Sequence, residues 1–189
     1  MNIFTRKQLR EQAMKACGCV DMPFTYSTKR ENMVNSALNE SRTYLGTTIF
    51  LSHSHHDAEL VKDIVALLKS VGVTVYVDWM DDSMPTKTCG STAEKIKQKI
   101  RENQKFIFLA TNAALESKWC NWEIGVGDII KHSSNNMAIW AVKEDNTEWE
   151  GNEYLQLYPS VRLVNGEITV VHAGCQYTGD SLTTWIQKR

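Results

Sequence analysis

Residues 47–78 decide the fold of this chain, and they read TTIFLSHSHHDAELVKDIVALLKSVGVTVYVD. The stretch begins with a short apolar run, Thr47 to Leu51, and continues through a polar loop into an amphipathic segment from Asp57 to Ser70. Gly72 follows that segment at a position typical of a helix end, and the apolar residues at helical spacing are Leu60, Ile64, Leu67 and Leu68. A second apolar run, Val73 to Asp78, completes a strand–helix–strand unit, which predicts two parallel strands joined by a covering helix.

The same alternation continues along the chain. Apolar runs at Lys105 to Thr111 and Asn136 to Val142 predict a third and a fourth strand, with a helix from Ser117 to Lys131 between them. Ser91 with Glu94 three residues later forms a capping box, which predicts that another helix begins there. We therefore expect an α/β fold in which a parallel sheet carries helices on both faces.

The two ends of the chain elaborate this core. Near the C-terminus, Asn165-Gly166 between two apolar runs predicts a β-hairpin, and a last helix is expected around Leu182 to Gln187. The first 45 residues carry seven basic and four acidic side chains, whereas the remainder is net negative. In this first segment we expect one amphipathic helix carrying Leu9 to Cys17 and a second from about Lys29 to Leu38.

The charge step suggests a division of the chain. Residues 1–45 are interpreted as an N-terminal helical extension and residues 46–189 as the main domain, with its common core at about 47–142 and an elaboration at 143–189. The extension is expected to cover the domain, and a partner-docking arm is the alternative.

Composition limits the classes of function. The chain has 189 residues, 42% hydrophobic, and its net charge of −1 provides no basic field for nucleic acid. Apolar runs such as Phe106 to Ala110 are too short to span a bilayer, and Met1 to Arg10 lacks the apolar core of a signal peptide. Five cysteines at irregular spacing predict free thiols. We therefore expect a cytoplasmic protein that binds neither nucleic acid nor membrane.

Candidate site residues follow the predicted strands, because ligands of open parallel sheets bind at the carboxyl ends of the strands. The first strand leads into Ser52-His53-Ser54-His55-His56 and then a helix N-terminus, which favours an anion such as phosphate. Ordinary N-capping by Ser54 or His55 is the alternative. Neighbouring histidines seldom converge on one ion, so we expect polar loop histidines and no metal site.

The loop after the second strand is unusually long. It runs from Trp79 to Gly90, about twelve residues, and contains Asp81 and Asp82. Since such connections typically take about 2–6 residues, the length favours a lid or an interaction loop. A solvated acidic loop is the alternative.

The helix at Ser117 to Lys131 places a carboxylate on its apolar face. Glu123 shares that face with Trp119, Val126 and Ile130, at steps of three and four. A buried carboxylate there is either bonded to the backbone or to a serine hydroxyl, as a structural brace, or has a raised pKa suited to chemistry. Cys120 lies nearby, but no histidine is paired with it in sequence.

Three motifs occur in a recognisable order. They are Ile49-Phe50-Leu51-Ser52-His53-Ser54, a second strand running into a long acidic loop, and Ser117-Lys118-Trp119-Cys120-Asn121-Trp122-Glu123. Together they resemble bacterial Toll/interleukin-1 receptor (TIR) domains over about residues 47–142. The resemblance implies a flavodoxin-like parallel sheet.

The resemblance also implies an activity. Many TIR domains cleave NAD+ at the nicotinamide–ribose bond with a glutamate placed as in Trp-Cys-x-x-Glu, and Glu123 matches that position. By the same resemblance Trp119 would line the pocket, the loop of Ser52, His53 and Ser54 would lie at the diphosphate, and the further substrate-binding residues would be Asp78, Trp79 and Asp82. NAD+ would be the substrate, with no cofactor and no metal required.

The resemblance extends to biological context. A stand-alone member looks like the signal-producing proteins of Thoeris-type anti-phage systems, in which a cyclic or linear ADP-ribose product activates a separate effector. The long loop from Trp79 to Gly90 would join two copies. A non-catalytic adaptor that self-associates through this loop is the alternative. A phosphoacceptor receiver is disfavoured, because the first strand ends in Ser52-His53 and lacks the acidic pocket.

Overall fold

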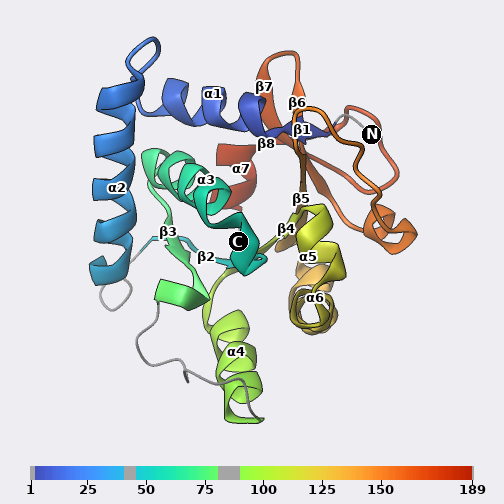
Figure 1. The fold of residues 1–189 in the computed structure, drawn as a ribbon. Helices are drawn as coiled ribbons and strands as arrows, with labels where there is room; N and C mark the ends of the chain where they lie inside the picture. The colour runs from blue at the N-terminus through green and yellow to red at the C-terminus, as the bar shows by residue number, and fades with distance from the viewer. Residues whose placement is uncertain (1–2, 41–45, 81–89, 189) are drawn as a thin grey trace.

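The computed structural model describes residues 3–40, 46–80 and 90–188, and only the backbone of residues 38–40 and Met80. The described strands form one sheet in the order β3-β2-β4-β5-β6-β7-β8, and β1 pairs with the carboxyl end of β5 (Figure 1). The strands are β1 (Phe4–Thr5), β2 (Thr48–Ser52), β3 (Thr74–Tyr76), β4 (Lys105–Ala110), β5 (Met137–Lys143), β6 (Ser160–Val164), β7 (Glu167–Val171) and β8 (Gly179–Ser181).

The central strands have a flavodoxin-like order. β2 to β6 are parallel, and numbered along the chain they lie in the order 2-1-3-4-5. β7 and β8 extend the sheet in antiparallel fashion. From β2 the next strand along the chain, β3, is added on one side, and β4 is added on the other, so the strand order reverses between β2 and β4. The crevice that such sheets use for ligands lies beyond the carboxyl ends of these two strands.

Helices cover both faces of the sheet, as predicted (Figure 1). α1, α3 and α7 pack on one face, with α2 outside α3, and α4, α5 and α6 pack on the other. The helices are α1 (Arg6–Ala16), α2 (Pro23–Glu40), α3 (Ala58–Ser70), α4 (Gly90–Glu102), α5 (Asn112–Glu116), α6 (Lys118–Lys131) and α7 (Leu182–Gln187). The short 3₁₀ turns are η1 (His55–Asp57), η2 (Asp78–Met80), η3 (His132–Ser134) and η4 (Glu153–Leu157).

Two glycine turns lie where the sequence predicts them. Gly72 adopts φ 81° after α3, and its N–H donates to the carbonyl of Lys69 at 3.0 Å, as expected of a helix C-terminus. Asn165 and Gly166 adopt φ 51° and 83° between β6 and β7, which is the conformation that a two-residue hairpin needs.

One predicted helix start is wrong, and another differs by a single residue. α2 begins at Pro23 instead of Lys29, because proline already has the backbone angle of a first helical residue and needs no hydrogen-bond partner for its nitrogen. α4 begins at Gly90, one residue before Ser91, so this helix occurs where the sequence predicts it. A capping box opens α1, between Thr5 and Gln8.

The N-terminal helices are built into the main core. Leu9 and Ala13 of α1 are fully buried in the apolar cluster that also contains α3. α2 is attached by a buried ion pair, in which Arg30 lies 2.8 Å from Asp63, and the Tyr26 hydroxyl donates to the same carboxylate at 2.7 Å. The described part of residues 1–45 therefore covers α3 and belongs to the same packed unit.

Two further properties concern the described residues alone. Cys17, Cys19, Cys120 and Cys175 are free thiols, which confirms the prediction for these four, and Cys89 lies outside the described ranges. None of the described helices has the length and apolarity needed to cross a membrane.

Candidate active site

α6 carries Glu123 and is held close to the sheet. The Ser117 side chain caps the helix by accepting the N–H of Cys120 at 3.3 Å. A Cβ at Gly127 would lie 3.0 Å from the Phe106 ring of β4, so the absence of a side chain lets α6 approach the strand.

The buried face of α6 differs in part from the face that the helical spacing predicts. Trp119, Val126 and Ile130, which the sequence places at the centre of the inward face, are only half-buried. The helix is rolled about its axis, and its buried residues are Cys120, Glu123, Ile124, Gly127 and Lys131. The prediction that Glu123 points inward is nevertheless confirmed.

Glu123 is a buried carboxyl group that accepts one hydrogen bond from the residues that the structure describes. Its side chain belongs to a residue that is 5% exposed, and the Ser52 hydroxyl donates to Oε2 at 2.5 Å. The pKa of Glu123 is raised to about 8, chiefly by burial; the hydrogen bond from Ser52 opposes this rise, and the nearby charge of Asp78 adds to it. The group therefore has both the serine partner of a structural brace and the raised pKa typical of a reactive acid.

His53 follows Ser52 and points to the other face of the sheet, as alternation along a strand requires. Its Nδ1 donates to the carbonyl of Leu51 at 3.0 Å, and its Nε2 lies 3.5 Å from Oδ1 of Asp78. The Trp79 ring packs edge-on against the imidazole at a centroid distance of 5.1 Å. Burial lowers the pKa of His53, and the charge of Asp78 opposes this only in part. The structure thus brings His53, Asp78 and Trp79 together.

The other predicted site residues are more dispersed. Ser54 acts as the N-cap of η1 and accepts the N–H of His56 at 3.4 Å. Trp119 packs edge-on against Trp122 on the α6 side of the sheet, whereas Trp79 packs on the α3 side. Asp82, with most of the loop from Trp79 to Gly90, lies outside the described residues.

Two residues around the crevice, Asp57 and Thr111, were not identified from the sequence, and Cys120 was considered there only as a nucleophile. The Thr111 hydroxyl donates to Asp57 at 2.6 Å, which ties the loop after β4 to the loop after β2. The Cys120 thiol donates to the carbonyl of His53 at 3.2 Å, and burial raises its pKa to about 12, so it is not a thiolate nucleophile. Asp57 and Thr111 look like ordinary helix caps in the sequence, and nothing in their local pattern indicates that they meet.

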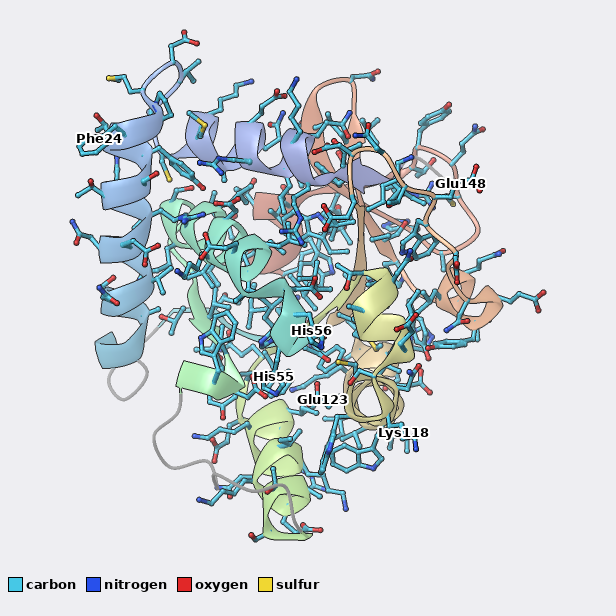
Figure 2. All side chains as sticks on the ribbon, viewed as in Figure 1. Phe24, His55, His56, Lys118, Glu123 and Glu148 are labelled. Atoms are coloured by element: carbon cyan, nitrogen blue, oxygen red, sulfur yellow. The ribbon has the colours of Figure 1, made fainter. Side chains whose placement is uncertain are left out.

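Figure 2 places Glu123, His55 and His56 in the same region of the view, with Phe24 and Glu148 at the periphery. Among the cavities lined by described residues alone, two of about 620 and 550 Å³ lie elsewhere, with Trp149 lining both and Glu123 neither. The described candidate site is therefore the strand-end cluster of Ser52, His53, Asp78 and Glu123.

Comparison with known proteins finds two relatives. The "Probable 3' cyclic ADP-D-ribose synthase ThsB'" of Bacillus cereus (strain MSX-D12) is 27% identical over an alignment 196 residues long, which covers 100% of both chains. The "Putative cyclic ADP-D-ribose synthase TIR2" of Cytobacillus dafuensis is 29% identical over 79 residues, which cover 40% of this chain and 21% of that protein.

The family model described as "TIR domain" matches residues 49–169. The match includes β2 through most of β7 and both Ser52 and Glu123, and it extends beyond the core of about 47–142 expected from the motifs. Because it spans well over half of the chain and agrees with the observed strand order, this protein belongs to the TIR domain family.

Proposed function

We propose that this protein consumes NAD+, breaking the bond between nicotinamide and ribose and closing the remaining ADP-ribose into a cyclic product. A relative that aligns over the whole length of both chains carries the name of a cyclic ADP-ribose synthase, and so does the second relative. The observation that carries the proposal is Glu123, a buried carboxyl group hydrogen-bonded to Ser52 at the carboxyl end of β2.

The reaction needs one negative charge in a water-poor place. When the bond between nicotinamide and C1′ of the ribose breaks, its electron pair neutralises the pyridinium ring, and C1′ takes on oxocarbenium character. A carboxylate held beside C1′ stabilises that positive charge more strongly in a buried site than in water. Glu123 would supply this charge in its ionised form.

The second half of the reaction decides the product. A nucleophilic atom of the same ADP-ribose can attack C1′ and lose its proton, which closes a ring. If water attacks instead, linear ADP-ribose forms. These steps use NAD+ as a substrate, and no cofactor or metal is needed for them.

The remaining assignments are parts of the same proposal. Ser52 would orient Glu123, while His53, Ser54, Asp78, Trp79, Asp82 and Trp119 would bind substrate. The loop from Trp79 to Gly90 would mediate association between copies. The product would act on a separate effector protein in anti-phage defence, as the similarity to Thoeris-type proteins suggests.

The product of the reaction tests the proposal. Purified protein is incubated with NAD+ under three conditions: at low protein concentration, at high protein concentration, and with a crowding agent. The nucleotides are then separated, and their masses are measured by mass spectrometry. We expect nicotinamide together with a nucleotide whose mass is that of NAD+ without nicotinamide. A product heavier by one water would assign a hydrolase, and intact NAD+ under all conditions with tight self-association would favour the adaptor.

A further inference from the structure

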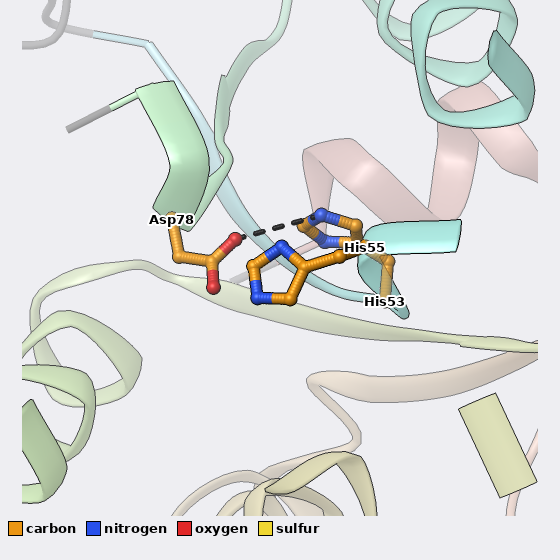
Figure 3. A group of neighbouring side chains, drawn as sticks. All are labelled: His53, His55 and Asp78. Carbon is orange, nitrogen blue, oxygen red and sulfur yellow. Dashed lines mark ion pairs between the residues drawn. The ribbon is translucent and has the colours of Figure 1, made fainter. Parts of the chain in front are cut away.

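Three potential metal ligands meet at the carboxyl ends of β2 and β3. Ligand atoms of His53, His55 and Asp78 all lie within 4.8 Å of one another. Figure 3 shows the two imidazole rings and the carboxylate turned toward one another. The sequence places the histidines on one loop, and the parallel pairing of β2 with β3 brings Asp78 beside them. The expectation that these histidines are ordinary loop residues does not account for this arrangement.

His53 presents a buried atom without a partner to this cluster. Its Nδ1 must donate to the carbonyl of Leu51, which leaves a lone pair on Nε2 of the neutral ring. The His53 side chain is 2% exposed, and Nε2 makes no hydrogen bond to any residue that the structure describes. Buried polar atoms normally have a hydrogen-bond partner, so the unpaired Nε2 of His53 indicates that this atom binds a ligand.

The carboxylate atom that Nε2 faces indicates what kind of ligand would fit between the two atoms. Oδ1 of Asp78 lies 3.5 Å away and also carries lone pairs. Two such atoms repel each other unless a proton or a metal ion lies between them, and burial of His53 disfavours the protonated ring. Two ligands of a tetrahedral zinc ion, each about 2.0–2.2 Å from the metal, are about 3.4 Å apart, which matches this pair.

The surroundings hold two ligands in place and leave the third adjustable. The backbone N–H of Trp79 donates to Asp78 at 2.8 Å, and the bond from His53 to Leu51 fixes its imidazole, as outer-shell partners do in metal sites. His55 is exposed, so rotation of its side chain can close the remaining gap, and its exposure provides an entry path.

We propose that His53, His55 and Asp78 bind one divalent transition-metal ion, with zinc as the best match. Two imidazole nitrogens and one carboxylate oxygen suit zinc and its neighbours, whereas magnesium and calcium prefer sites made of oxygen alone. Three protein ligands leave a fourth position open for water or an anionic oxygen. This assignment does not depend on the proposed NAD+ chemistry.

Direct binding to the full-length protein tests the site. Protein stripped with a chelator is titrated with Zn²⁺ by isothermal titration calorimetry and with Co²⁺ by visible absorption. We expect one ion per chain. Replacing exposed His55, as His55→Ala, or making the near-isosteric change Asp78→Asn should each weaken binding at least about tenfold, since even outer-shell changes cost about that much.

The matched control is His56→Ala, which removes the neighbouring exposed histidine that is not part of the cluster. It should bind Zn²⁺ like the parent, and thermal melts without metal should show that all variants are folded. The proposal is overturned if no saturable binding of one ion occurs, or if His56→Ala weakens binding as much as His55→Ala. An intense near-ultraviolet thiolate band with Co²⁺ would also overturn it, because cysteines would then hold the ion.

Discussion

Burial and the hydrogen bond from Ser52 shift the pKa of Glu123 in opposite directions. Burial favours the neutral acid and raises its pKa to about 8, whereas the Ser52 hydroxyl favours the carboxylate. An ionised Glu123 is therefore a destabilising group in the folded protein. Such a conflict between stability and local chemistry is typical of functional sites.

The first prediction concerns stability. In the unfolded chain Glu123 loses its proton near 4.5, but in the folded protein it does so only near 8, so stability falls as pH rises between these values. Glu123→Gln stays neutral and should escape this loss. Urea unfolding should show little difference from the parent near pH 4 and a gain of a few kcal/mol for the variant near pH 9. A difference that does not vary with pH would contradict the raised pKa.

The second prediction concerns turnover. If ionised Glu123 carries the reaction, kcat/KM for nicotinamide release should rise with pH, with a midpoint near 8, and level off about one pH unit higher. Ser52→Ala removes the hydrogen bond that favours the carboxylate, so the midpoint should move upward by about one unit. A profile that is flat from pH 6 to 9, or a downward shift in the variant, would contradict this account.

At the scale of elements, the position of Glu123 depends on how closely α6 packs on β4. A Cβ at Gly127 would lie 3.0 Å from the Phe106 ring, which is fully buried and stacked on Phe50. The ring has little room to move, so a methyl group at this point should push the helix, and Glu123 with it, away from β2.

The third prediction uses two glycines of that helix. Gly127→Ala should destabilise the protein by about 1–3 kcal/mol through overpacking and should also lower turnover. Gly125→Ala is the control, because Gly125 is exposed with open space around it, and it should stabilise by about 0.5–1 kcal/mol. Denaturant unfolding of the two variants provides the comparison, and equal effects would show that the contact with Phe106 is unimportant.

Elements with a strong local pattern were predictable from the sequence. The four predicted strands, which are β2 to β5, the hairpin at Asn165-Gly166 and α7 all occur where periodicity and turn residues place them. β1 was missed because it has two residues and pairs with β5, whose Val142 lies far along the chain from Phe4. Local pattern carries no information on such a pairing.

The candidate site was predictable to a similar extent. Helical spacing indicated that Glu123 points inward, and a serine hydroxyl was one of its expected partners, but which serine depends on the packing of α6 against β2. The meeting of His53, His55 and Asp78 depends on the pairing of two strands, so the histidines alone did not reveal it.

For the whole molecule, the N-terminal segment is part of the stable unit. Leu9 is fully buried between α1 and the core beneath it. Leu9→Ala should therefore cost about 2–5 kcal/mol, whereas Arg10→Ala on the exposed face of the same helix should change stability by less than about 0.5 kcal/mol. Thermal unfolding of both variants gives the answer. A small cost for Leu9→Ala would indicate a loosely attached arm.

The central claim is that the acid group of Glu123 performs NAD+ cleavage. The most direct measurement is the rate of nicotinamide release by Glu123→Gln, compared with Glu116→Gln, which makes the same chemical change at an exposed position of α5. We predict that Glu116→Gln retains the parent rate and that folded Glu123→Gln loses at least about a hundredfold, the scale of one lost electrostatic contribution to a transition state. A folded Glu123→Gln variant that releases nicotinamide at the parent rate would contradict the account.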